Sequence, residues 1–181
     1  SHMVNITGHI LPIRKICDMA HSKGVEVLVD GAHAFAQFPY SIPDLHCDYY
    51  GASLHKWLAV PLGVGFLYVK NGKAGDIWPL LADGERPGTD IARLNHIGTH
   101  PVHSDLAISN SIDFYNSIGA EKKEARLRFL QQYWTSKVRG LGNIELYTPT
   151  DPKRSCAIAN VGIKGMKPAV LAETLLKKYG I

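Results

Sequence analysis

Two residues with catalytic chemistry, Asp30 and Lys56, lie 26 positions apart, and each follows an apolar stretch. A lysine amine condenses with an aldehyde to form a Schiff base, and a carboxylate keeps a pyridine nitrogen protonated so that the ring withdraws electrons. A lone lysine is usually a solvated surface residue, so the inference depends on the pair. Together the two residues indicate an enzyme that uses pyridoxal 5'-phosphate.

Three motifs around this pair resemble one family. They read V-x-V-D-G-A-H-A, D-Y-Y-G-x-S-x-H-K-W-L and P-L-G-x-G-F-L-Y-V. In these motifs the chain is similar to fold-type I pyridoxal-phosphate enzymes of the class V aminotransferase family. The D-G-A-H-A motif and a later G-T-H-P most resemble the isopenicillin N epimerase-like branch. The resemblance runs from about Val4 to the end of the chain, and it is most specific between Asp30 and Lys70.

The resemblance implies two contacts beside the cofactor ring. His33 would lie near the phenolic oxygen of the ring, and Asn5 would approach the same oxygen. The alternative for His33 is an ordinary core histidine, and the alternative for Asn5 is a turn residue.

The resemblance also implies contacts to the phosphate. Ser53 and His55 flank Lys56, and a hydroxyl and an imidazole N–H are both donors to phosphate oxygens. Thr99 matches a position that reaches across a dimer interface to the neighbouring subunit's phosphate. The implied assembly is therefore a homodimer with shared active sites. The alternatives are a strand-ending serine and a loop threonine.

Strand and helix patterns alternate along the chain and would position these residues. Ligands bind beyond the carboxyl ends of strands in open α/β sheets, which is where Asp30 and Lys56 fall. We therefore predict an α/β fold with a mostly parallel sheet flanked by helices, part of the fold-type I large domain, followed by a small α+β domain. The predicted strands are 25–29, 49–54, 64–69, 144–147 and 156–161, and the predicted helices are 12–24, 103–118, 121–139 and 168–179.

A shift in composition marks a domain boundary. The stretch 140–150 is rich in Gly, Thr, Pro and Asn. We assign 1–140 to part of the cofactor-binding large domain and 141–181 to the start of an incomplete C-terminal small domain. A second irregular stretch, 81–102, has the length of a functional or disordered loop.

Composition and charge bound the possible partners. The chain has 181 residues, 45% hydrophobic, and a net charge of +4. Basic and acidic residues alternate, as in 121–126, which is typical of a solvated helix face and disfavours nucleic acid as a partner. The three cysteines, Cys17, Cys47 and Cys156, are widely spaced and suggest a reducing compartment. No apolar run approaches the ~20 residues of a membrane span. We expect a cytoplasmic protein without a membrane partner.

A competing metal site would use His96, His100 and His103, which are spaced like ligands on a helix. Gly98 and Pro101 lie inside this span and disrupt the helix that the spacing assumes. We therefore expect no metal.

The predicted function is a pyridoxal-phosphate enzyme that acts on an amino acid or amine through a Lys56 Schiff base. Lys56 would move the proton at the substrate's α-carbon, while transamination, epimerisation and elimination remain open as outcomes. A cysteine desulfurase or selenocysteine lyase is an alternative, but Cys156 falls in an apolar segment rather than a flexible loop. A non-catalytic dimerisation or binding domain is the alternative from another class.

Members of the resembled family are considerably longer than this chain. We therefore expect a fragment that holds the cofactor weakly and is inactive alone. Ser1-His2-Met3 resembles a tag remnant, although Asn5, Thr7 and Gly8 match a family stretch, so the first residues are equally readable as native.

Overall fold

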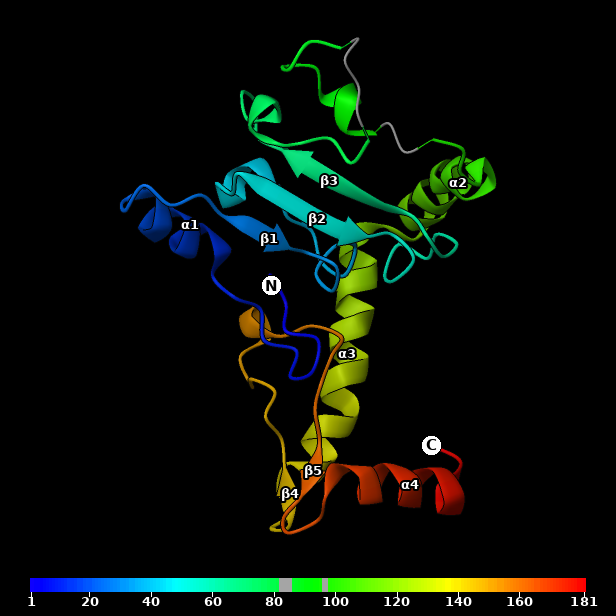
Figure 1. Ribbon diagram of the computed structural model, residues 1–181. Helices are drawn as coiled ribbons and strands as arrows, with labels where there is room; N and C mark the ends of the chain where they lie inside the picture. The colour runs from blue at the N-terminus through cyan, green and yellow to red at the C-terminus, as the bar shows by residue number, and fades with distance from the viewer. Residues whose placement is uncertain (82–85, 96–97) are drawn as a thin grey trace.

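The structure, a computed structural model, describes residues 1–81, 86–95 and 98–181. Figure 1 shows two lobes joined by a long helix, α3 (Ala120–Val138). A three-stranded sheet lies at one end of α3. A two-stranded sheet and the last helix, α4 (Pro168–Tyr179), lie at the other end.

The first lobe is built on strands β1 (Leu28–Asp30), β2 (Tyr49–Ser53) and β3 (Gly65–Val69), in that spatial order. β1 pairs with β2 in parallel, with Asp30 opposite Gly51. β2 pairs with β3 in antiparallel fashion, with Ser53 opposite Gly65. The α/β class is confirmed. The part of the sheet described here is mixed, because the turns after β2 return β3 antiparallel to it.

Two predicted strands differ from the structure. The predicted strand 25–29 is shorter, because only Leu28–Asp30 pair with β2 while Val25 and Glu26 are exposed. The predicted strand 156–161 is wrong. Its backbone donors bind side chains instead of a neighbouring strand: the Ala157 N–H donates to Gln37 Oε1 at 3.0 Å, and the Asn160 N–H donates to Thr148 Oγ1 at 2.8 Å.

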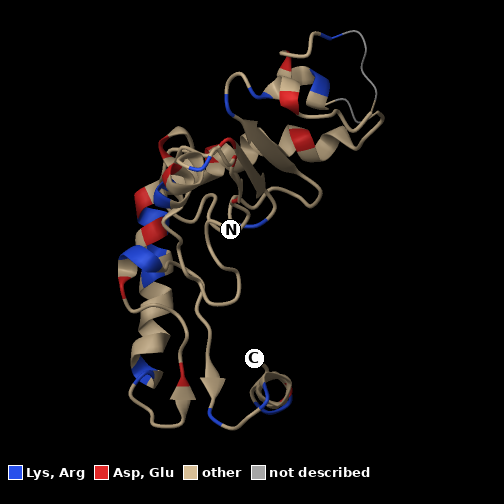
Figure 2. Cartoon of the chain, turned by 60° about the vertical axis from the view of Figure 1, so that its left-hand side comes forward, with Lys and Arg blue, Asp and Glu red and all other residues tan. Residues whose placement is uncertain are grey.

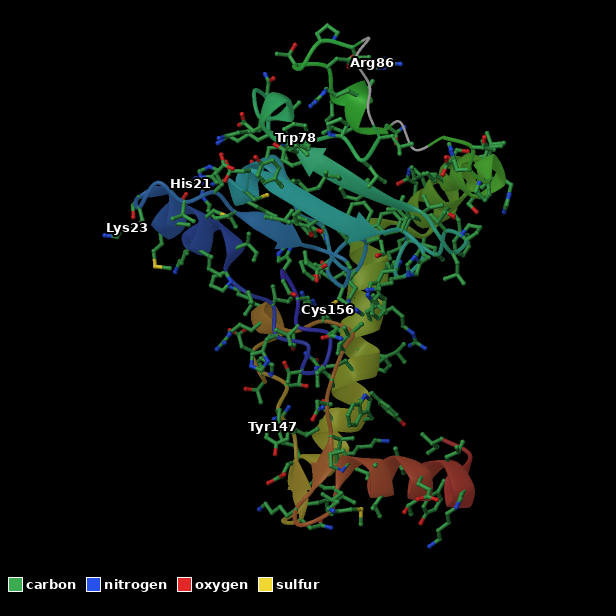
Figure 3. The ribbon with its side chains drawn as sticks, in the orientation of Figure 1. His21, Lys23, Trp78, Arg86, Tyr147 and Cys156 are labelled. Carbon is green, nitrogen blue, oxygen red and sulfur yellow. The ribbon has the colours of Figure 1, made fainter. Side chains whose placement is uncertain are left out.

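The second sheet is a short antiparallel pair, β4 (Ile144–Glu145) and β5 (Gly162–Ile163), with Ile144 opposite Ile163. The predicted strand 144–147 is therefore present at its first two residues. Between β4 and β5 the chain runs back along α3 to the N-terminal residues, and Figure 3 labels Cys156 where these segments meet.

The four predicted helices are present. Gly119, with a φ of 87°, breaks the chain between the second and third, and Gly180, with a φ of 69°, ends the last. Within the described residues, no helix combines the length and apolar character needed to cross a bilayer. The remaining helices are α1 (Ile13–His21) and α2 (Val102–Ile118), with short 3-10 turns η1 (Pro43–Leu45), η2 (Ala74–Asp76), η3 (Ile91–Asn95) and η4 (Pro152–Arg154).

The two faces of the first sheet are covered unequally. On one face Val29, Tyr50 and Ala52 are buried against α1. On the other face Leu28 is 67% exposed and Leu67 is 47% exposed. Successive strand residues point to opposite faces, so Asp30 and Ser53 share the open face with Leu28.

The N-terminal residues belong to the core. The side chains of His2 and Met3 are buried, and the His2 N–H donates to the Asp30 carbonyl oxygen at 2.7 Å.

The turn after Asp30 depends on a close approach between Gly31 and Tyr50. Tyr50 is fully buried, and its hydroxyl is hydrogen-bonded to the Tyr40 hydroxyl and, at 3.2 Å, to His2 Nδ1. A Cβ atom at position 31 would lie 1.9 Å from the Tyr50 ring. Glycine is therefore required sterically at this position.

We predict that Gly31→Ala lowers the free energy of unfolding by about 3 kcal/mol, because the buried Tyr50 ring must move to admit the methyl group. Urea unfolding followed by circular dichroism measures the change. The matched control is Gly140→Ala, where an added Cβ meets nothing within 4 Å. Equal stability of the two variants would contradict the steric role of Gly31.

Candidate active site

The polar ends of two strands meet at one edge of the first sheet. Asp30 is the last residue of β1, and Ser53 is the last residue of β2. Because these strands are parallel, their carboxyl ends lie at the same edge. Both residues line an open hollow of about 590 Å³ on the uncovered sheet face. The other lining residues include Ser1, Ala32, Gly51, Gly65 and Leu67.

Lys56 and His33 form a pair beside this edge. Lys56 lies in the turn after β2, His33 in the turn after β1, and the distance from Lys56 Nζ to His33 Nε2 is 3.1 Å. Burial lowers the pKa of His33, and the nearby Lys56 charge lowers it further, while Asp30 opposes the change. The ring is therefore neutral at pH 7. Since an ammonium has only donors, Nε2 accepts from Lys56 and the ring proton lies on Nδ1.

Asp30 is an ionised carboxylate. Its Oδ1 accepts the Ala32 N–H at 2.9 Å, and its Oδ2 accepts the Ser1 hydroxyl at 3.2 Å. The Ala32 hydrogen bond lowers the pKa of Asp30. Burial opposes the change, and Ser1, the N-terminal amine and Lys56 reinforce it. Asp30 thus supplies a fixed negative charge at the mouth of the hollow.

Three buried side-chain nitrogens around Lys56 have no hydrogen-bond partner among the described residues. They are His33 Nδ1, His55 Nδ1 and Trp57 Nε1. Leaving a buried polar atom without a partner costs about 1–3 kcal/mol, so such atoms normally bind water or a ligand. Together with the amine of Lys56 and the carboxylate of Asp30, this set fits a group that carries an aldehyde, a ring nitrogen and an anionic phosphate.

The His33 turn is held by Gln37, a residue that the sequence analysis did not single out. Gln37 is fully buried. Its Nε2 donates to the His33 carbonyl oxygen at 2.5 Å, and its Oε1 accepts the Ala157 N–H at 3.0 Å. The contact to Ala157 joins residues 120 positions apart, which no local sequence pattern relates, so no sequence signal identified Gln37.

Two predicted cofactor contacts lie apart from this hollow. Asn5 is exposed in a turn near the N-terminus, and Thr99 is exposed just before α2. Neither residue lines the hollow that contains Asp30 and Ser53. The predicted roles of Asn5 and Thr99 therefore remain predictions.

The three histidines weighed as a metal site have no common centre in the described chain. His100 pairs with Asp105 at 3.0 Å and with the Gly98 carbonyl oxygen at 3.3 Å, contacts that raise the pKa of His100. His103 is exposed on α2, and His96 lies outside the described residues. Within 1–81, 86–95 and 98–181, no cluster of three histidine, cysteine or carboxylate side chains can hold a metal ion.

The three cysteines are all buried thiols. Burial raises the pKa of Cys47 and of Cys156 to about 11, and it also raises the pKa of Cys17. The thiolate is the nucleophilic form of cysteine, so none of these side chains is poised for nucleophilic attack at neutral pH.

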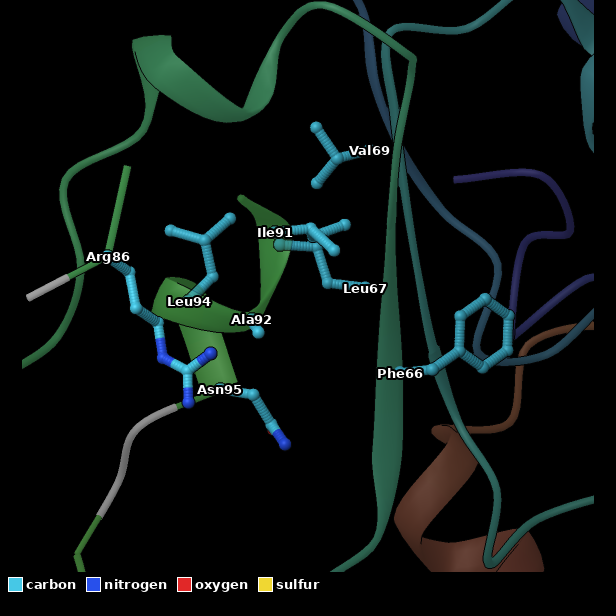
Figure 4. Close-up of a pocket in the computed structure, with 8 residues that line it drawn as sticks. All are labelled: Phe66, Leu67, Val69, Arg86, Ile91, Ala92, Leu94 and Asn95. Carbon is cyan, nitrogen blue, oxygen red and sulfur yellow. The ribbon is translucent and has the colours of Figure 1, made fainter. Parts of the chain in front are cut away.

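A second hollow, of about 560 Å³, lies on the same sheet face but contains none of the predicted site residues. Figure 4 shows Leu67 and Val69 of β3 facing Ile91 and Leu94, while Phe66 points to the opposite side of the strand. This hollow separates β3 from η3, so we assign it no part in the chemistry.

Comparisons with known proteins identify relatives over the whole chain. A family model described as Aminotransferase class-V matches residues 1–181. Isopenicillin N epimerase of Amycolatopsis lactamdurans is 33% identical over 173 residues, which cover 87% of this chain and 44% of the epimerase. Cysteine desulfurase of Haloferax volcanii is 29% identical over 162 residues, which cover 84% of this chain and 38% of that protein. The chain therefore spans less than half the length of these curated relatives.

Solved structures share the fold. A cysteine desulfurase of Escherichia coli superposes with a TM-score of 0.82 at 25% identity, over 99% of this chain and 46% of that one. The apo cysteine desulfurase of Thermococcus onnurineus NA1 also gives a TM-score of 0.82, at 21% identity, over 96% of this chain and 46% of that one. The second likeness shows the fold alone.

We predict opposite effects of two neighbouring charges on the pKa of His33, measured by NMR titration of its ring protons. Lys56→Met removes a positive charge that disfavours the imidazolium, so the pKa of His33 should rise. Asp30→Asn removes a negative charge that favours the imidazolium, so it should fall. The resonance is assigned by its loss in His33→Gln. A shift of the same sign in both variants would contradict this geometry.

Proposed function

The chain belongs to the class-V aminotransferase family, and on this premise we propose that it forms the Lys56-bearing part of a pyridoxal-phosphate enzyme acting on an amino acid or amine. The observation that carries the proposal is the Lys56–His33 pair at the edge where β1 delivers an ionised Asp30. The buried nitrogens without partners in the described residues lie on His33 and on either side of Lys56, where an anionic ligand would satisfy them.

Each side chain has a separate task in holding the cofactor. Lys56 provides the amine for covalent attachment, and Asp30 keeps the ring nitrogen protonated. Ser53 and His55 donate to the phosphate, and His33 donates from Nδ1 toward the phenolic oxygen. We retain Asn5 as a second contact to that oxygen and Thr99 as a contact to the phosphate of a neighbouring subunit.

When bound, pyridoxal phosphate supplies an aldehyde that captures the substrate amine and a protonated ring that accepts electron density from the α-carbon. Lys56 would take the α-proton of the substrate or return it. His33 stays neutral beside Lys56 and accepts a hydrogen bond from the amine through Nε2. Asp30 supplies the negative charge opposite the ring nitrogen.

Epimerisation is the outcome we place first, because the D-G-A-H-A motif and the epimerase of Amycolatopsis lactamdurans support it. Epimerisation would need the proton to return to the α-carbon from the opposite face. Transamination would need it to be delivered to a different carbon. A cysteine desulfurase is the second candidate, supported by relatives and by structural likeness. Within this chain, Cys17, Cys47 and Cys156 are buried with raised pKa values, so none of these three is proposed as the nucleophile of such a reaction.

We further propose a cytoplasmic homodimer with shared active sites, and a division into domains 1–140 and 141–181. The separate β4–β5 sheet supports the division. The exposed position of Thr99 supports a contact with a second subunit. The mixture of Lys, Arg, Asp and Glu along α3 in Figure 2 supports a small-molecule substrate rather than a nucleic acid.

We predict that pyridoxal phosphate, trapped on the chain by borohydride, is found mainly on Lys56 by peptide mass mapping. Lys56 should exceed Lys70 and Lys73 by about tenfold, the factor that one hydrogen bond to a charged group is worth. The neutral His33 accepts a hydrogen bond from Lys56, whereas the ammonium of Lys73 is held by Glu26.

Two variants sharpen this measurement. Lys56→Met should abolish the dominant adduct, and Lys70→Met should leave it unchanged. Preferential labelling of Lys70 or Lys73 would remove Lys56 from the proposed role.

We predict that Asp30→Ala retains the trapped adduct on Lys56 but slows exchange of the substrate α-proton by about 10²–10³-fold, because a preorganised charge opposite the ring is lost. Proton NMR of an added L-amino acid in D₂O measures the exchange in the longer parent enzyme expected from the family, with cofactor present. Asp44→Ala, which removes an exposed carboxylate of η1, is the matched control. Near-normal exchange in Asp30→Ala would exclude Asp30 from the mechanism.

A further inference from the structure

Lys123 of α3 reaches the turn that carries Lys56. Its Nζ donates to the carbonyl oxygen of Trp57, the residue directly after Lys56. These residues are 66 positions apart, so this contact ties a helix to the catalytic turn across the fold. Lys122, the neighbouring residue on α3, is exposed to solvent, whereas Lys123 is half-buried.

Lys123 is a partly buried cation without a carboxylate partner in the described chain. The adjacent Glu124 pairs with Arg128 instead, at 2.7 Å. The contacts of the Lys123 ammonium are the Trp57 carbonyl oxygen and the Tyr115 ring, whose centroid lies 5.1 Å away. Burial lowers the pKa of Lys123. Burying an ammonium is costly unless it is hydrogen-bonded, so the bond to Trp57 offsets that cost.

The backbone of the catalytic turn has few other restraints. Across the described residues, two side chains from other elements bond to the backbone of 55–59: Lys123, and Ser111, whose hydroxyl lies 3.5 Å from the Ala59 carbonyl oxygen. The Ser111 distance is at the outer limit for a hydrogen bond. Lys123 therefore supplies the main polar restraint on the peptide next to Lys56.

The same helix holds a second segment in the same way. Arg128 donates to the carbonyl oxygens of Pro152 and Ser155, one turn further along α3. Ser155 precedes Cys156 and Ala157, which contact Gln37 and through it the His33 turn. Two cations of α3 thus bind main-chain oxygens. Lys123 binds next to Lys56, and Arg128 binds a segment that contacts the His33 turn through Gln37.

We propose that Lys123 is a positioning residue for Lys56, holding the Trp57 carbonyl so that the Lys56 amine stays within hydrogen-bonding distance of His33. The catalytic meaning of this role rests on the proposed function. The positional role itself can be measured in the cofactor-free chain.

The test compares Lys123→Met, which keeps the apolar stem but removes the donor, with Lys122→Met on the exposed side of the same helix. In hydrogen exchange followed by mass spectrometry, Lys123→Met should speed exchange of the amides in 55–60 by about tenfold or more, since a charge-assisted hydrogen bond is worth at least that factor. Exchange in β1 and β2 should not change. Lys122→Met should resemble the parent chain throughout.

A second measurement reports on the Lys56 amine. Reductive methylation with formaldehyde, mapped by peptide mass, should modify Lys56 several-fold faster in Lys123→Met. Lys123→Arg restores a cationic donor and should return the rate toward the parent value. If Lys123→Met does not fold, Lys123→Gln replaces it, and faster exchange in 55–60 is again expected.

Unchanged exchange in 55–60, or a uniform increase over the whole chain, would overturn the positioning role, because the second result reports general destabilisation. Neither measurement needs the cofactor. A failure of pyridoxal phosphate to label Lys56 would therefore count against the proposed function and not against this inference.

Discussion

The contact between Gly31 and the Tyr50 ring is the constraint on which the site depends. Tyr50 is the second residue of β2 and has no exposed surface, and the turn after β1 passes directly over its ring. β1 and β2 are parallel, with Asp30 opposite Gly51, and the close approach of Gly31 to Tyr50 is compatible with this register. Because both strands end at one edge, the turns that follow them meet, and His33 reaches Lys56. A Cβ atom at position 31 would lie 1.9 Å from the Tyr50 ring, so a side chain there would displace the turn that carries His33.

The electrostatics of the site follow from which charges are exposed and which are buried. Asp30 lies at the rim, where a backbone N–H and a hydroxyl keep it ionised. His33 lies deeper, where burial and the Lys56 charge keep it neutral. An ionised acid and a neutral base thus coexist within one small site, each set by its surroundings. Such a separation of protonation states is common where proton transfer must occur near pH 7.

The sequence predicted the helices and the site residues better than it predicted how the strands pair. Helical periodicity located α2, α3 and α4 to within a few residues, because their turn-breaking glycines, such as Gly119, are local signals. Sequence motifs identified the candidate site residues Asp30, His33, Ser53 and Lys56. The antiparallel return of β3 and the irregular course of 156–161 depend on contacts between distant residues, which a local pattern does not contain. Lys123 looked like part of a solvated charged face, yet it is half-buried against the Trp57 carbonyl.

The bridge made by Gln37 has a consequence for biosynthesis. Its side chain joins the His33 carbonyl to the amide of Ala157, a residue 120 positions further along the chain. Contacts between residues so distant form late, because a long loop must close first. On a ribosome, the bond between Gln37 and Ala157 therefore forms only after residue 157 has emerged from the exit tunnel. Until then the Gln37 Oε1 lacks its Ala157 partner, although the Nε2 can already donate to the His33 carbonyl oxygen.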